Sequence, residues 1–419
     1  MTTFPLNQAT DWVEEFGSPL YVYDAATIQQ QYRRISGAFD DDLNVGIHFA
    51  CKALNNLNIL RLLKAEGAGL DAVSLGEIHL GLQAGFTPDE ILFTPNGVGM
   101  GEIRAAVEIG VHINIDNLET LEEFANEFGN SIPICVRINP HIMAGGNAKI
   151  SVGHIDSKFG ISIHQMRHLH RIVDHMGLHV HGLHMHTGSD IIDIASFMRG
   201  ANLLLEVAHD FKELTYIDFG SGFKIGYKPH ERTTDIEAFG ATMSARFKVF
   251  CLEYGRDLQL IFEPGKFLVS EAGALLTTVN STKTTPSTVF AQVDSGFNHF
   301  PRPMLYDAYH HIENISNPEG ENRLYTIVGY ICETDTFGYD RQLSEVRRGD
   351  VLAFHNAGAY CSTMASNYNS RVRPAEVLVM HGQAHLIRER ETIEDLTRGI
   401  VALDLFQEEV KASEEFVLN

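Results

Sequence analysis

Positive charge is scarce in this sequence. The 419 residues include 32 lysines and arginines against 54 acidic residues, which gives a formal charge of −22. Nucleic-acid binding needs clustered basic side chains that displace counterions, so this balance argues against a nucleic-acid partner. A small-molecule enzyme or an acidic assembly fits the composition better.

Cysteines are few, and long apolar runs are missing. The five cysteines are widely spaced and form no CxxC pair, which favours reduced thiols over disulfides or a zinc site. No apolar run approaches the ~18 residues that a membrane span requires, and no basic-then-apolar leader opens the sequence. We therefore expect a cytoplasmic protein without a membrane partner.

Eight short β-rich segments alternate with helical patterns. The predicted strands span residues 45–51, 70–73, 91–94, 112–115, 134–138, 179–186, 216–219 and 259–263. Helical spacing follows the first strand (Leu54, Leu57, Leu60, Leu63) and the fourth (Leu118, Leu121, Phe124). Eight strand-then-helix units predict an α/β protein with a parallel (β/α)8 barrel over residues 24–265.

The pattern changes after residue 265. Strand-like runs separated by turns, such as "RLYTIVGYIC" and "DVLAFHNAG", predict an antiparallel β domain over residues 266–419. The N-terminal segment 1–23 leads into the strand-like run "SPLYVYD". We expect this run to pair with the C-terminal domain.

Catalytic groups of such barrels lie at the C-terminal ends of the strands. The residues at these predicted ends are Lys52, Asp71, Arg137, His186 to Ser189, Gly220-Ser221-Gly222, and Glu263 to Gly265. A lysine, an aromatic base, a glycine-rich turn and a carboxylate therefore converge on one mouth of the barrel.

Each of these groups has a task in pyridoxal phosphate chemistry. Lys52 would supply the amine that forms an imine with the cofactor aldehyde. The turn 220–222 lets backbone N–H groups approach a phosphate. Glu263 would face the pyridine nitrogen, and His186 would lie against the ring. A lone strand-end lysine is more often a surface residue, and Gly-Ser-Gly alone is more often a turn, so the prediction rests on the convergence.

Two clusters stand in the C-terminal domain. Arg302 and Tyr306 lie four residues apart; an arginine near a tyrosine is usually structural, but it is also a natural fork for a substrate carboxylate. "GYICETD" places Cys332, Glu333 and Asp335 together. A thiol among carboxylates is ordinarily unreactive, so Cys332 alone reads as a buried residue.

Several segments together resemble the fold type III pyridoxal-phosphate decarboxylases. In chain order they are "FACKAL", "DAVSLGEI", "HMHTGSD", "DFGSGF", "FEPGK", "RPMLYDAYHH", "GYICETD" and "GAYCSTMASNYN". They cover nearly the whole chain and most closely match the members that act on diaminopimelate. The set is specific although no single segment is.

The resemblance implies a role for each matching residue. Lys52 would hold the cofactor, His186 would stack on its ring, Glu263 would face its nitrogen, and the turn 220–222 with Tyr360 would contact its phosphate. A homodimer would complete the site, with Cys332 and Glu333 supplied by the partner chain. Lys52 or Cys332 would then return a proton after CO₂ leaves. We expect the remaining cofactor contacts from Asp71, Arg137, Ser189, Gly265 and Lys266.

The substrate implied is meso-2,6-diaminopimelate, decarboxylated to L-lysine. Arg302 and Tyr306 would bind its distal carboxylate and Glu333 its distal amine, with Lys266 and Tyr360 beside them. The family usually has arginine where this chain has Lys266, and lysine cannot form arginine's planar fork, so this contact is altered. The phosphate turn is likewise Gly-Ser-Gly in place of three glycines.

Alternatives remain open. A related decarboxylase would act on carboxynorspermidine or on a basic amino acid such as ornithine or lysine. His184 and His186 share a strand face, which would also suit a metal-dependent hydrolase, although we predict no metal. A third alternative is an inactive regulatory homologue. Finally, the segment 140–159 contains glycines, and we expect it to cover the site.

Overall fold

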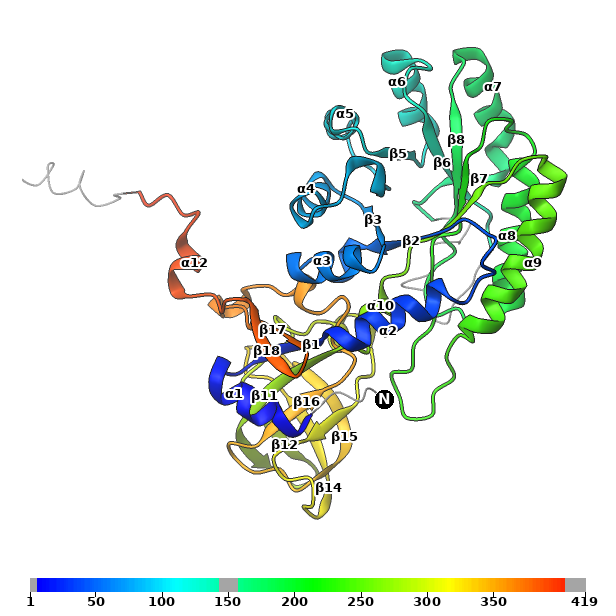
Figure 1. Ribbon diagram of the computed structural model, residues 1–419. Helices are drawn as coiled ribbons and strands as arrows, with labels where there is room; N and C mark the ends of the chain where they lie inside the picture. Colours follow the sequence, from blue (N-terminus) through cyan, green and yellow to red (C-terminus); the bar gives the residue numbers. More distant parts are fainter. Residues whose placement is uncertain (1–5, 143–156, 404–419) are drawn as a thin grey trace, which may run out of the picture.

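A closed ring of eight parallel strands forms the first part of the computed structural model, which describes residues 6–142 and 157–403 (Figure 1). The strands are β2 (Val45–Ala50), β3 (Gly69–Ala72), β4 (Ile91–Phe93), β5 (His112–Ile115), β6 (Ile134–Asn139), β8 (Val180–His184), β9 (Tyr216–Asp218) and β10 (Gln259–Phe262). They pair in the order β5-β4-β3-β2-β10-β9-β8-β6, and a β5–β6 pairing closes the ring. All eight predicted strands and the barrel are confirmed. The short β7 (Ile161–Ser162), which we did not predict, pairs with β6.

Helices surround this barrel (Figure 1). They are α2 (Ala25–Ser36), α3 (Leu57–Ala65), α4 (Leu75–Ala84), α5 (Met100–Ile109), α6 (Leu118–Phe128), α7 (Met166–Met176), α8 (Ile194–Ala208) and α9 (Ile236–Tyr254). Helix α3 begins after Leu54, because the side chain of Asn56 caps it by accepting from the Asn58 amide. Leu60 and Leu63 are buried against the barrel, as the leucine spacing predicts.

A mixed nine-stranded sheet forms the second part. Its strands are β1 (Leu20–Asp24), β11 (Gly273–Thr284), β12 (Val289–Val293), β13 (Ile312–Asn314), β14 (Asn322–Val328), β15 (Thr336–Ser344), β16 (Val351–Phe354), β17 (Ala375–Met380) and β18 (Gln383–Arg388). Most neighbours are antiparallel, but β12–β14 and β1–β17 run parallel. The sheet is therefore mixed, which corrects the purely antiparallel expectation.

The N-terminal strand joins the C-terminal sheet, as predicted. Strand β1 lies between β11 and β17, and all its residues from Leu20 to Tyr23 are buried. Trp12 of α1 (Ala9–Phe16) packs on the same side of the sheet as Leu20 and Val22. Apolar burial thus ties the start of the chain to strands more than 250 residues away.

Short helices complete the described structure. They are α10 (Lys266–Val269), α11 (Arg302–Tyr306), α12 (Ile393–Thr397) and the 3-10 turns η1 (Leu6–Gln8), η2 (Cys51–Ala53), η3 (Pro88–Glu90), η5 (Ile163–Gln165), η6 (Ser362–Met364) and η7 (Tyr368–Ser370). No helix within residues 6–142 and 157–403 is long and apolar enough to cross a membrane. Most of the segment predicted to cover the site, residues 143–156, lies outside the described residues.

Candidate active site

Lys52 lies at the mouth of the barrel on a single 3-10 turn. Strand β2 ends at Ala50, and η2 carries the lysine beyond it. Its Nζ donates to a carboxylate oxygen of Asp71 from β3, and Thr94 donates to the other oxygen. Burial by itself would lower the pKa of Lys52, but Asp71, Tyr360 and Glu263 outweigh it and raise the pKa. The amine is therefore held as a cation beside a fully buried carboxylate.

A cavity of about 380 Å³ opens next to Lys52. Ten of the twelve predicted cofactor residues line it, namely Lys52, Arg137, His186, Ser189, Ser221, Gly222, Glu263, Gly265, Lys266 and Tyr360. The other two lie behind its wall, where Asp71 bonds to Lys52 and the Gly220 amide donates to Asp218. The barrel thus gathers residues more than 300 positions apart around one cavity.

Glu263 is buried at the base of this cavity. Its Oε2 lies 3.2 Å from Nε2 of His184, and the other ring nitrogen of His184 lies 2.9 Å from Asn114. Burial raises the pKa of Glu263, but His184 and Lys52 outweigh it and hold the pKa well below its usual range. The carboxylate is therefore ionised. Its Oε1 is buried and has no partner among the described residues.

The glycine-rich turn after β9 is held by close backbone contacts. Gly220 and Gly222 have φ angles of +60° and +137°, which disfavour residues with a side chain. A Cβ at Gly222 would lie 2.2 Å from the Gly188 carbonyl oxygen. The Ser221 amide donates to Nδ1 of His186 at 3.2 Å. Burial, followed by Arg137, lowers the pKa of His186 to about 3, so its ring is neutral.

These features fit pyridoxal phosphate. A buried carboxylate oxygen without a partner is costly unless a ligand satisfies it, and a protonated ring nitrogen would do so at Glu263. Lys52 offers an amine at the same cavity. The backbone around Gly222 can approach an anion because no side chain intervenes.

Two polar lining residues were not predicted. Thr94 and Asn96 follow β4 directly and line the cavity with the others. The strand-end rule could have found them, because Thr94 is the last residue of the predicted strand 91–94 and Asn96 lies two residues beyond it. Arg137 was predicted, and its guanidinium lies 4.8 Å from the ring centroid of Phe159, a further lining residue.

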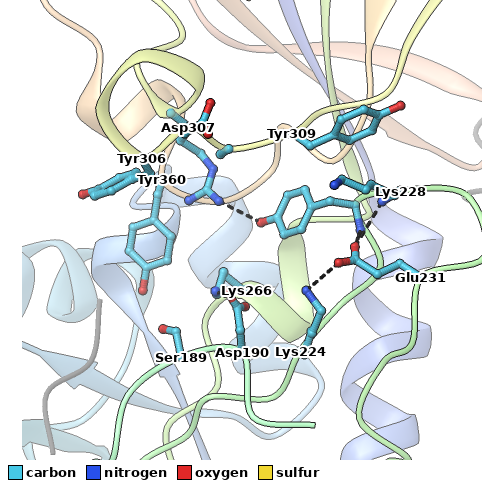
Figure 2. A pocket seen from close by; sticks show the side chains of 13 residues that line it. Ser189, Asp190, Lys224, Lys228, Glu231, Lys266, Tyr306, Asp307, Tyr309 and Tyr360 are labelled. Carbon is cyan, nitrogen blue, oxygen red and sulfur yellow. Dashed lines mark hydrogen bonds and ion pairs between the residues drawn. The ribbon is translucent and has the colours of Figure 1, made fainter. Parts of the chain in front are cut away.

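A second cavity of about 300 Å³ adjoins the first, and Ser189, Lys266 and Tyr360 line both (Figure 2). The predicted substrate residues Arg302 and Tyr306 line it as well. Arg302 is 8% exposed and donates to the Tyr227 hydroxyl and to His310, both at 3.3 Å. Among the described residues it forms no ion pair, so its buried charge is uncompensated.

Cys332 and Glu333 lie away from both cavities of this chain. Both are exposed; the Cys332 amide donates to Asn369, and Glu333 accepts from the Tyr368 hydroxyl at 2.9 Å. The alternative interpretation of Cys332 as a buried structural thiol is therefore wrong for this chain. The structure of one chain does not bring these two residues to Lys52.

The two histidines of the predicted pair differ in their contacts. Donor atoms of His184, Asp218 and Glu263 lie within 4.8 Å of one another, as a cation site would require, whereas His186 is not part of this group. His186 instead bonds to the glycine-rich turn. The paired-histidine metal site of the hydrolase alternative is therefore not formed among the described residues.

Comparisons with known proteins agree with this geometry. Residues 25–270 match the family model described as "Pyridoxal-dependent decarboxylase, pyridoxal binding domain". The chain is 41% identical to diaminopimelate decarboxylase of Methanothermobacter thermautotrophicus, over 93% of each chain.

Solved structures are similar over the same extent. The Helicobacter pylori diaminopimelate decarboxylase complexed with L-lysine superposes with a TM-score of 0.85 at 32% identity, over 93% of this chain and 98% of that one. The M. jannaschii enzyme in complex with L-lysine gives a TM-score of 0.84 at 34% identity, over 94% of each chain. The chain therefore belongs to the diaminopimelate decarboxylase family of fold type III pyridoxal-phosphate-dependent decarboxylases.

Proposed function

We propose that this chain decarboxylates meso-2,6-diaminopimelate to L-lysine and CO₂ as the last step of lysine biosynthesis. The observation that carries the proposal is the pair of adjoining cavities. One is lined by the Lys52 amine, and the other is lined by Arg302, a buried cation that has no carboxylate partner within the described part of the chain. A substrate with one reacting amino-acid centre and one distal carboxylate would satisfy both.

The residues of the first cavity would hold the cofactor. Lys52 would bind its aldehyde carbon through the amine, Glu263 would face its ring nitrogen and His186 its ring. Ser189, Ser221, Gly222, Gly265 and Tyr360 would surround the phosphate. When bound, pyridoxal phosphate supplies an electron sink for the pair that CO₂ leaves behind.

The protein's own groups would direct the remaining chemistry. The negative charge of Glu263 keeps a ring nitrogen protonated, which favours electron withdrawal. The neutral His186 ring excludes water from one face of the cavity. Lys52 would be one donor for the proton that replaces CO₂ on the α-carbon, and Cys332 of a second chain would be the other.

Arg302 and Tyr306 would bind the distal carboxylate of the substrate. A guanidinium matches a carboxylate through two parallel hydrogen bonds, and burial strengthens this interaction. Lys266 and Tyr360 line both cavities, so they would lie beside the substrate where it passes from one to the other.

We further propose a homodimer in which each site is completed by Cys332 and Glu333 of the other chain. Their exposure in one chain supports this, because groups for the reacting carbon and the distal amine would otherwise face solvent. Five free cysteines also support a reducing, cytoplasmic location.

Product analysis tests the reaction. Purified protein loaded with pyridoxal phosphate would be incubated separately with meso-diaminopimelate, L-ornithine, L-lysine, L-arginine and carboxynorspermidine. We expect lysine and CO₂ from diaminopimelate alone. Another active substrate would overturn the roles of Arg302 and Glu333, and no CO₂ from any substrate would overturn the decarboxylase proposal itself.

Mixing two inactive variants tests the shared site. Lys52→Ala and Cys332→Ala chains, unfolded and refolded together, would form mixed dimers in which one site has both residues intact. Random pairing would restore about a quarter of the parental sites. No recovery, with mixed dimers verified by mass, would show that each chain supplies its own residues.

A further inference from the structure

The second cavity is lined by more charged side chains than the single distal carboxylate of the proposed substrate would require. Four cations line it (Lys224, Lys228, Lys266 and Arg302) together with three carboxylates (Asp190, Glu231 and Asp307). Lys224 lies 2.9 Å from Glu231, whereas Lys228 and Asp307 are exposed to solvent and therefore screened. The balance inside the cavity depends on Lys266, Arg302 and Asp190.

Asp190 engages Lys266 directly. The Nζ of Lys266 donates to Oδ1 of Asp190 at 2.6 Å, and the lysine side chain is only 8% exposed (Figure 2). Burial lowers the pKa of Lys266, and Asp190 opposes this change. A buried charge of this kind is stable only when it is paired.

Asp190 also acts on Arg302. Burial lowers the pKa of Arg302, but Tyr227, Cys361 and Asp190 outweigh it and raise the pKa. Asp190, Lys266 and Arg302 line the same cavity, and the single carboxylate of Asp190 bonds to Lys266. The backbone of Asp190 adopts a φ of +65°, which is uncommon outside glycine and is often found at functional positions.

We propose that Asp190 is a specificity-determining residue that neutralises Lys266 and so leaves Arg302, among the described residues that line the second cavity, as the buried cation available to the distal carboxylate. This inference rests on the proposed function. In this arrangement the ion pair between Lys266 and Asp190 prevents Asp190 from pairing with Arg302. Arg302 therefore stays available to the substrate carboxylate. The second cavity then retains one unpaired positive charge, which can bind one substrate carboxylate.

Removing the charge of Lys266 and removing the charge of Asp190 should have opposite effects on the binding of carboxylates. Lys266→Met frees Asp190 to pair with Arg302, so KM for diaminopimelate rises at least about 10-fold. Asp190→Asn frees Lys266 as a second cation, so pimelate, the substrate's dicarboxylate without amines, binds about 10-fold more tightly. Asparagine also tolerates the left-handed backbone.

The double variant distinguishes neutralisation of Lys266 by Asp190 from direct binding of the substrate carboxylate by Lys266. Lys266→Met with Asp190→Asn again leaves Arg302 alone, so KM and pimelate affinity return to within about 3-fold of the parent values. A double variant with the same raised KM as Lys266→Met would overturn the proposal, because Lys266 itself would then bind the carboxylate. Unchanged pimelate affinity in Asp190→Asn would overturn it as well.

Pimelate binding to cofactor-loaded protein is measured by calorimetry, which does not require turnover. Should the parent release no CO₂ from diaminopimelate yet show the expected calorimetric pattern, the proposed reaction fails and the charge assignment holds. Lys266→Gln with Asp190→Asn repeats the test if the methionine variant unfolds. Lys248→Met is the matched control for lysine removal, because Lys248 of α9 pairs with Asp40 and Asp42 and lines neither cavity.

Discussion

His184 contacts Glu263 at the C-terminal end of β10, with Nε2 of the ring 3.2 Å from one carboxylate oxygen. The opposite side of the ring contacts Asn114 at 2.9 Å. The carboxylate is therefore oriented by a side chain that is itself fixed by a second contact. The other oxygen, Oε1, is buried and has no hydrogen-bond partner among the described residues, which makes Glu263 well placed to set the charge of a bound ring.

Glu263→Gln should lower turnover while leaving cofactor binding largely intact. Glutamine keeps the shape and the contact to His184 but carries no charge to hold a ring nitrogen protonated. We expect kcat to fall by about 10² or more, in line with the loss of a preorganised electrostatic contact. Single-turnover kinetics with saturating cofactor measure this, and Glu263→Asp controls for geometry. Parental turnover in the glutamine variant would contradict the role.

Lys52→Ala should abolish both the visible absorbance of covalently bound cofactor and activity. Lys52 supplies the amine that would bind the cofactor, and loss of a covalent catalyst costs at least about 10³-fold in rate. Asp71 still accepts from Thr94, so the fold should persist, as circular dichroism would show. An unchanged absorbance spectrum would refute the assignment; Lys64→Ala, which removes an ion pair with Glu90 outside the cavity, is the control.

Gly222→Ala should weaken cofactor binding far more than Ser221→Ala. A Cβ at Gly222 meets the Gly188 carbonyl at 2.2 Å and strains a φ of +137°, whereas Ser221 contacts His186 through its backbone amide. We expect at least about a 10-fold rise in cofactor Kd for the first variant and about 3-fold or less for the second. Fluorescence titration of apoprotein measures both. Equal losses would mean that the Ser221 hydroxyl is essential.

Arg302→Met should raise KM for diaminopimelate by about 10- to 100-fold with little change in kcat, because it removes binding shared by the ground and transition states. Steady-state kinetics test this, with thermal unfolding to verify the fold. Arg323→Met removes an exposed arginine of β14 that pairs with Glu321 and should leave KM unchanged. If both variants behave alike, the second cavity does not bind the substrate.

Buried histidines should make stability depend on pH. Burial lowers the pKa of His48 to about 4 and that of His181 to about 4, against about 6.5 when unfolded. Between pH 6.5 and pH 4, these histidines bind protons in the unfolded chain but remain neutral in the folded protein. As the pH falls through this range, each histidine therefore lowers the free energy of unfolding by up to about 1.4 kcal/mol per pH unit. Above pH 6.5 their effect disappears.

His48→Gln tests this dependence. Urea unfolding of the variant and the parent at pH 7.5 and pH 5.5 should show a smaller loss of stability in the variant at the lower pH. His385→Gln replaces an exposed histidine of β18 and should not alter the parental slope. A slope unchanged by His48→Gln would mean that its ring accepts a proton in the folded state.

The hydrophobic pattern determined the barrel and the place of the candidate site residues. Strand length and β-branched composition located all eight strands, because parallel strands buried on both faces need continuous apolar runs. The strand-end rule then placed Lys52, His186 and Glu263 at one mouth. The C-terminal sheet was located but its parallel pairings were not, since strand order depends on long-range contacts that local sequence does not encode.

Only the tertiary structure decided how charges are distributed between the cavities. Lys266 and Asp190 lie 76 residues apart, and Arg302 meets Tyr227 across 75. Their side-chain types are visible in the sequence, but which carboxylate neutralises which cation depends on distances of a few ångströms in a low-dielectric interior. The sequence by itself thus determined which groups reach the barrel mouth, and packing decided which of them remain free to bind a ligand.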